Sequence, residues 1–143
     1  MEESIGSVMA DAARLIRRTF DERARTIGVT RPQWQVLTTL SRHEGVNQGS
    51  LAEMLDVEPI TLCRMLDRLQ DAQLVERRRD PDDRRAWLLF LQPEARKLLQ
   101  EMRPLGHEVM NAALKGFSKS ERETLHDLLD RIRHNLSRRN PDN

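Results

Sequence analysis

Two short amphipathic helices followed at once by a charged hairpin occupy the middle of this chain, and this order restricts the possible folds most. The periodicity predicts helices over residues 48–55 and 59–72, separated by a tight break at DVEP. Pro59 lies in the first turn of the second helix, where a proline costs no hydrogen bond. The residues of the first helix that are expected to face inward are Leu51, Met54 and Leu55. Two short helices joined by a turn of about four residues predict a helix-turn-helix.

The hairpin is predicted from the stretch LVERRRDPDDRRAWLLFL, residues 74–91. Residues 86–91 are aromatic and aliphatic without a strand breaker, whereas DPDD at 80–83 is typical of a turn. A lone hairpin is only marginally stable, so this one is expected to lean on the helices. Together the elements predict a winged helix, in which one helix enters a major groove about 12 Å wide and the hairpin reaches the adjacent minor groove.

The second helix of the pair is the predicted recognition helix. Its apolar residues repeat at steps of four and three and are expected to face inward: Leu62, Leu66 and Leu69. Ile60, Thr61, Arg64 and Arg68 then face outward. Arg64 can fork onto a guanine and Arg68 suits a phosphate, while Thr61 can bond a base or a phosphate and Ile60 can touch a thymine methyl group. The alternative for each position is an ordinary exposed helix residue.

Arginines at the tip of the hairpin suit a narrow, strongly negative minor groove. Arg84 and Arg85 are the candidates, and Asp83 is expected to hold Arg85 by pairing with it across the turn. The alternative is a solvated loop with local ion pairs. Because 24 Lys and Arg nearly balance 23 Asp and Glu, any electrostatic function must come from such clusters rather than from net charge.

Long amphipathic helices are predicted on both sides of the winged helix. One spans about residues 4–26, and another runs from 30 to 42 with Thr30 as its cap. A long helix begins at 93, with a bend expected at Pro104, and Ser118 with Glu121 forms a capping box for the last helix. The apolar faces at the two chain ends exceed what one winged helix can cover, which predicts a symmetric homodimer that reads a palindromic operator in double-stranded DNA.

The fold class is therefore mainly α with a small β-wing, a winged helix-turn-helix with dimerisation helices from both chain ends. We divide the chain into a dimerisation helix at 1–28, a DNA-binding region at 29–92 and dimerisation helices at 93–143, all in one continuous structural unit.

Several classes of function find no support in the sequence. The single cysteine, Cys63, excludes an internal disulfide and fits a reducing compartment, and no signal peptide or membrane helix is recognisable, so a cytoplasmic protein without a membrane partner is expected. No catalytic set, phosphate-binding loop or cofactor motif occurs. His126 and Asp130, four residues apart, could hold a metal but are more often a solvated pair, so no metal and no enzyme activity are expected.

The run LAEMLDVEPITLCRMLDRLQDAQLVERRRDPDDRRAWLLFLQPEA resembles the central block of the MarR family of bacterial transcription regulators, and its SlyA-like branch. The resemblance extends to ARLIRR, TRPQW and FSKSERETLHDLLDRI, and the Asp83, Arg84, Arg85 signature is its specific part. It implies a dimeric winged-helix repressor or activator that contacts DNA through Thr61, Arg64 and Arg68 and through Arg85 at the wing.

The resemblance also implies a pocket for a small effector, often a phenolic or aromatic carboxylate that releases the DNA. By position, Arg17, Trp34 and Thr38 resemble the pocket residues of SlyA-like proteins. An arginine can pair with a carboxylate while an indole forms an aromatic wall. The alternative is a core tryptophan and a surface arginine.

Two positions depart from the family pattern. Gln73 replaces the usual glycine after the recognition helix, so either a left-handed helix end there is strained or the helix ends differently. Gln92 replaces the threonine that commonly caps the following long helix. Cys63 lies in the recognition helix rather than near the N-terminal helix, where peroxide-sensing members carry their cysteine, so it is interpreted as a small helix residue.

Two further functions stay open at this point. The effector could be an acyl-CoA thioester instead of a free aromatic acid. The winged helix could also be a protein-interaction module, whose binding should hardly change with salt, whereas DNA binding through phosphates should weaken steeply.

Overall fold

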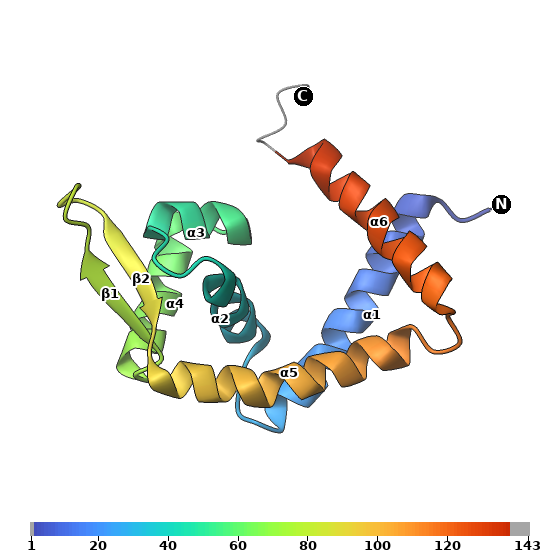
Figure 1. The fold of residues 1–143 in the computed structure, drawn as a ribbon, viewed down its shortest axis with the longest axis horizontal. Helices are drawn as coiled ribbons and strands as arrows, with labels where there is room; N and C mark the ends of the chain where they lie inside the picture. Colours follow the sequence, from blue (N-terminus) through green and yellow to red (C-terminus); the bar gives the residue numbers. More distant parts are fainter. Residues whose placement is uncertain (1, 138–143) are drawn as a thin grey trace. The chain divides into compact units, whose positions relative to one another are not determined.

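The computed structural model describes residues 2–137, and within this range it contains six helices and one two-stranded antiparallel sheet (Figure 1). The elements follow in the order α1 (Ile5–Arg25), α2 (Arg31–Arg42), α3 (Gln48–Leu55), α4 (Pro59–Asp71), β1 (Val75–Arg79), β2 (Trp87–Leu91), α5 (Pro93–Ala113) and α6 (Lys119–Leu136). The predicted winged helix-turn-helix is confirmed, with α3 and α4 as the helix pair and β1 and β2 as the wing.

Side-chain caps mark the helix starts that the sequence predicts. Thr30 accepts a hydrogen bond from the amide of Gln33, whose side chain accepts one from the amide of Thr30, which completes a capping box. Ser118 and Glu121 form the same reciprocal pair at the start of α6. These bonds satisfy amide groups that would otherwise lack intrahelical partners.

A single apolar cluster holds α2, α3, α4, the wing and the start of α5 together. The recognition-helix residues predicted to face inward, Leu62, Leu66 and Leu69, are fully buried in it. On α3 the prediction for Met54 is wrong, because its side chain is 40% exposed and Ala52 is buried instead. The helix is only eight residues long, so its inward face is narrow and is filled by Leu51 and Ala52.

After three of the helices, one residue adopts the left-handed conformation, and the amide of the following residue donates to the carbonyl five residues earlier. Gly28, Asp56 and Gln73 have φ values of 71°, 52° and 62°. The next amide bonds back in each case, as from Leu74 to the carbonyl of Leu69 at 2.9 Å. The left-handed end expected to be strained at Gln73 is therefore present, and this glutamine occupies a conformation that favours glycine.

The hairpin pairs Val75 with Leu91 at its base and Arg79 with Trp87 at its last rung. The edge of β2 that faces away from β1 is also paired. The amide of Gly45 donates to the carbonyl of Leu89 at 2.8 Å, and the amide of Leu89 donates to the carbonyl of Val46 at 2.9 Å. Gln92 does not cap α5 with its side chain. The amide group of that side chain instead donates to the carbonyl of Val75 at 3.3 Å, which ties the end of β2 to β1.

The chain divides into two compact units, Met1–Val109 and Met110–Asn143. The first holds α1 to α4, the wing and most of α5, which continues through Pro104. In the second, α6 buries none of its residues. The three-part division at residues 28 and 92 stays a prediction. No described helix is both long enough and apolar enough to cross a lipid bilayer.

Candidate nucleic-acid interface

The recognition helix α4 presents its predicted DNA-contacting side chains on its exposed face. Because Leu62, Leu66 and Leu69 are buried, the intervening residues Ile60, Thr61, Arg64 and Arg68 point away from the core. Ile60 is 61% exposed, which is unusual for so large an apolar side chain. Within residues 2–137 neither Arg64 nor Arg68 takes part in an ion pair. The helix therefore offers two available guanidinium groups and one methyl-rich side chain on one face.

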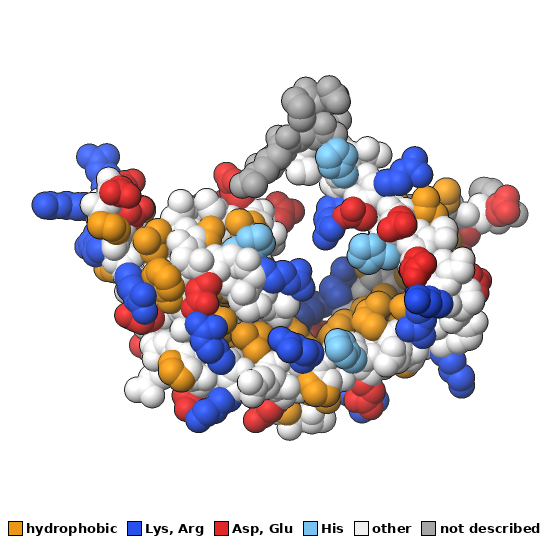
Figure 2. Space-filling view, viewed as in Figure 1, with side chains coloured by type: hydrophobic (Ala, Val, Ile, Leu, Met, Phe, Trp, Pro, Cys, Tyr) orange, Lys and Arg blue, Asp and Glu red, His pale blue; other side chains and the backbone are white. Residues whose placement is uncertain are grey.

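The wing tip is ordered by its own acidic residues. The carboxylate of Asp80 accepts a hydrogen bond from the amide of Asp82 at 2.9 Å, and that of Asp83 accepts one from the amide of Arg85 at 3.0 Å. The prediction that Asp83 pairs with the Arg85 guanidinium is therefore wrong, because its carboxylate is used to close the backbone turn. Both arginines at the tip, Arg84 and Arg85, are exposed, and Figure 2 shows basic side chains at the free end of the hairpin beside acidic ones.

The three arginines of β1 make different contacts, which the sequence did not predict. Arg77 faces the helices, and its side chain is only 13% exposed. It donates hydrogen bonds to the backbone carbonyl of Cys63 at 3.0 Å, to Asp67 at 2.7 Å and to Gln70 at 3.0 Å. The wing is thus bonded directly to the recognition helix. Strand alternation from buried Val75 was the available signal, because it places residue 77 on the inner face.

The next two arginines of β1 lie over aromatic rings of β2. The guanidinium of Arg78 is 4.0 Å from the ring centre of Phe90 on the outer face, and Arg79 is 4.2 Å from that of Trp87 on the inner face. Arg78 also pairs with Glu76 at 3.0 Å. Such cation–π contacts contribute about 0.5–1 kcal/mol each at exposed sites.

Glu44 connects the loop after α2 with β2 and α5. Its carboxylate accepts a hydrogen bond from Arg96 at 2.7 Å and another from the amide of Leu91 at 2.9 Å. The Arg96 bond, with the help of the Leu91 amide, holds the pKa of Glu44 below its ordinary value. The junction of wing, loop and long helix therefore depends on a charged carboxylate.

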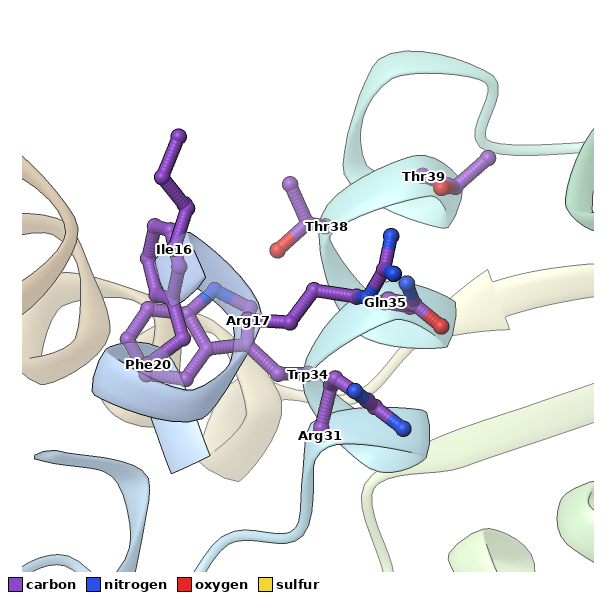
Figure 3. A pocket seen from close by; sticks show the side chains of 8 residues that line it. All are labelled: Ile16, Arg17, Phe20, Arg31, Trp34, Gln35, Thr38 and Thr39. Carbon is purple, nitrogen blue, oxygen red and sulfur yellow. The ribbon is translucent and has the colours of Figure 1, made fainter. Parts of the chain in front are cut away.

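The three residues predicted for the effector pocket lie together in one cavity of about 270 Å³ between α1 and α2 (Figure 3). Its lining consists of Ile16, Arg17, Phe20, Arg31, Trp34, Gln35, Thr38 and Thr39. Phe20 and Trp34 form an edge-to-face pair with ring centres 5.3 Å apart, and Arg17 extends across the cavity toward α2. Trp34 also packs against the apolar cluster of Ala24, Val29 and Met102, so it belongs both to the core and to the cavity wall.

Residues missed at this cavity could have been found from helix geometry. Arg31 and Gln35 were missed, although they lie seven and three residues before the predicted Thr38 on α2, on the same side of that helix. Phe20 follows Ile16 by four residues on α1 in the same way.

No group of three or more metal-binding side chains occurs within residues 2–137. On α6, His126 and Asp130 do not pair with each other. The imidazole of His126 lies 3.6 Å from Asp127, and Asp130 pairs with Arg133.

Comparisons with known proteins agree with this geometry. The model of the MarR family matches residues 29–87. The transcriptional regulator PA3341 is 34% identical, with a TM-score of 0.82 over 93% of this chain and 98% of its own. A mutant MarR from E. coli complexed with operator DNA is 26% identical, with a TM-score of 0.79 over 90% and 92% of the two chains. The transcriptional repressor CouR bound to a 23-mer DNA duplex is 25% identical, with a TM-score of 0.82 over 91% and 92%.

Proposed function

The chain belongs to the MarR family and is a winged-helix, DNA-binding transcription regulator. From this premise we propose that it acts in the cytoplasm as a homodimeric repressor, which binds a palindromic operator and is released from it by a small aromatic carboxylate. We also propose that it belongs to the SlyA-like branch. Family membership favours DNA over a second protein as the partner of the winged helix.

DNA recognition is assigned to α4 and the wing. Arg64 reads a guanine in the major groove, Thr61 and Ile60 reach the bases near the start of the helix, and Arg68 binds phosphate. Their common exposed face on α4 supports this assignment. Arg85, with Arg84 beside it and Asp83 closing the turn, enters the minor groove.

The homodimer is supported by apolar side chains that each unit leaves uncovered. On α1 the exposed residues are Ile5, Val8, Met9 and Leu15, and on α6 they are Leu128, Leu129, Ile132 and Leu136. Ile5, Val8 and Leu15 are spaced by three and seven residues, and Leu128, Ile132 and Leu136 by four, so each set forms a stripe along its helix. Soluble monomers rarely expose stripes of this kind, and a second copy that covers them would place two recognition helices about 34 Å apart, one helical turn of DNA.

The ligand class rests on one observation, which is that Arg17 extends over a cavity walled by Trp34 and Phe20. Within residues 2–137 Arg17 takes part in no ion pair, so its charge is available to a carboxylate, while the rings suit an aromatic body. Gln35, Thr38 and Thr39 add polar groups on the α2 side. A volume of about 270 Å³ fits a single-ring acid and lies at the small end of ligand pockets.

An acyl-CoA thioester is the second candidate. Only its acyl part would fit a cavity of about 270 Å³, so the nucleotide would have to lie outside, over Arg17 or Arg31. Arg31 is less available than Arg17, because it faces Asp21 at 3.8 Å.

The deciding experiment is a mobility-shift titration with the DNA that flanks the chain's own gene, at two salt concentrations. Benzoate, its neutral analogue benzamide and benzoyl-CoA are added in parallel. Binding that weakens with salt and is lost with benzoate but not with benzamide supports the proposal. Loss with benzoyl-CoA alone would transfer it to the thioester, and salt-independent or absent binding would contradict the DNA assignment.

The cavity is tested with the matched variants Arg17→Ala and Arg18→Ala. Both remove one arginine from α1, but only Arg17 lines the cavity. Ligand binding is followed by the fluorescence of Trp34 in a Trp87→Phe background, where it is the only tryptophan. We expect Arg17→Ala to weaken benzoate binding at least tenfold and Arg18→Ala to leave it within about twofold, since a charged hydrogen bond contributes roughly 1.5–3 kcal/mol. Equal affinities for the two variants would remove Arg17 from the site.

A further inference from the structure

Among residues 2–137, the hydrogen bonds of the loop that carries the wing's arginines all come from within the hairpin, including one from the amide of Asp80 to the carbonyl of Ala86 at 3.2 Å. The last rung of the ladder joins Arg79 to Trp87, and residues 80–86 lie beyond it. A loop of this length samples many conformations unless something fixes it, and ordering it upon binding would weaken the affinity for DNA. The position of Arg84 and Arg85 therefore depends on contacts between this loop and the paired strands.

Asp80 and Asp83 bond backbone amides within the tip, and one further side chain links the tip to the ladder. The guanidinium of Arg79 lies 4.2 Å from the ring centre of Trp87 and donates a hydrogen bond to the backbone carbonyl of Arg84 at 2.5 Å. A planar guanidinium can do both at once, because its face stacks on the indole while its edge donates. Arg79 thus connects the last rung of the ladder with the middle of the tip.

Trp87 lies on the inner face of the wing, beside the recognition helix. Together with Arg77 it lines a hollow that is completed by Gln48, Cys63 and Gln70. Arg77 is bonded to α4 through Cys63 and Asp67. The backbone of β1 therefore connects α4, through Arg77, to Arg79 and the carbonyl of Arg84.

We propose that Arg79 and Trp87 form a brace that positions the wing tip relative to the recognition helix, and that neither residue needs to touch DNA to set the affinity. Arg79 acts as a positioning residue, and Arg84 and Arg85 make the contacts. The inference rests on the proposed function, since it requires that the tip enter the minor groove.

The key variant is Trp87→Ala, because it removes the brace without removing any charge. With the DNA that flanks the chain's own gene, we expect Trp87→Ala and Arg79→Ala each to weaken binding about three- to tenfold, from the loss of the stacking and of the carbonyl contact. The double variant should lose no more than either single one, since both break the same support. Trp87→Phe keeps an aromatic face and should retain most of the affinity.

The salt dependence separates positioning from contact. A brace leaves the number of neutralised phosphates unchanged, so the slope of log affinity against log salt should stay that of the parent in both single variants. If Arg79 itself bound a phosphate, Arg79→Ala would lower the slope by about 0.9 and Trp87→Ala would bind normally, and the brace would be refuted. Additive losses in the double variant would refute it as well.

Arg85→Ala distinguishes failure of the brace from failure of the wing contact. Parental affinity in Arg85→Ala would contradict the proposed minor-groove role, and the brace with it. Weak binding by Arg85→Ala together with parental binding by Trp87→Ala would overturn the brace alone. Thermal unfolding at a fixed protomer concentration verifies that each variant is folded, and the emission of Trp87 in a Trp34→Phe background should change in Arg79→Ala, because the cation leaves the indole.

Discussion

Gln73→Gly should make the protein more stable although it removes side-chain atoms from the junction of α4 and the wing. Gln73 has φ 62°, where a side chain is strained, and its own side chain is exposed. The backbone bonds at this helix end are the amide of Gln73 to the carbonyl of Gln70 at 3.0 Å and the amide of Leu74 to that of Leu69 at 2.9 Å. Glycine keeps both bonds, because they involve only the backbone.

The magnitude follows from two opposing terms. A residue with a Cβ in the left-handed region costs about 1–2 kcal/mol, which glycine does not incur. Glycine loses about 0.5–1 kcal/mol more conformational freedom on folding. The net gain in the free energy of unfolding is about 0.5–1 kcal/mol, or a Tm higher by roughly 2–4 °C for a chain of this size.

Urea unfolding followed by circular dichroism measures this gain, with the protomer concentration held constant because a dimer's stability depends on it. Ala72→Gly is the matched control one residue earlier, where φ is −78° and glycine should destabilise by up to about 1 kcal/mol. Asp56→Gly should gain less than Gln73→Gly, since aspartate tolerates the left-handed region better. Equal losses in Gln73→Gly and Ala72→Gly would refute the reasoning. DNA affinity should stay within about twofold of the parent.

Three further predictions concern the wing junction, the base contacts and the dimer. Glu44→Ala leaves the amide of Leu91 unbonded and should destabilise by about 1–3 kcal/mol at neutral pH. Because the pKa of Glu44 is lowered in the fold, the stability that its charge contributes is complete above the ordinary carboxyl pKa and is lost as the pH falls through the lowered pKa, so the difference in urea stability between parent and variant should narrow on acidification. Arg64→Ala should relax the preference for one base pair in a selection from random duplexes, with about 1–3 kcal/mol of discrimination lost, and an unchanged consensus would exclude direct readout. Leu129→Glu should shift the protein toward monomer in sedimentation velocity, whereas Ser120→Glu, on the opposite side of the same helix, should not; a dimer that tolerates both would place the interface elsewhere.

The sequence determined the order and kind of the elements, because these follow from local rules. The steps of three and four on α4 identified its buried and exposed faces, and Thr30, Pro59 and Ser118 marked helix starts within a residue. The charged turn between two apolar runs identified the wing. Each of these signals lies within about a dozen residues, where periodicity and capping act directly.

The tertiary structure decided what each charged side chain does. The three consecutive arginines of β1 make different contacts: Arg77 bonds to α4, Arg78 stacks on Phe90 and Arg79 stacks on Trp87. Asp83 bonds a backbone amide instead of a guanidinium. The cavity likewise brings together Arg17 of α1 and Trp34 of α2, and the periodicity of each helix does not predict contacts between the two helices. Partners of this kind depend on strand register and helix packing, which bring together residues that are far apart along the chain, and no local pattern specifies them.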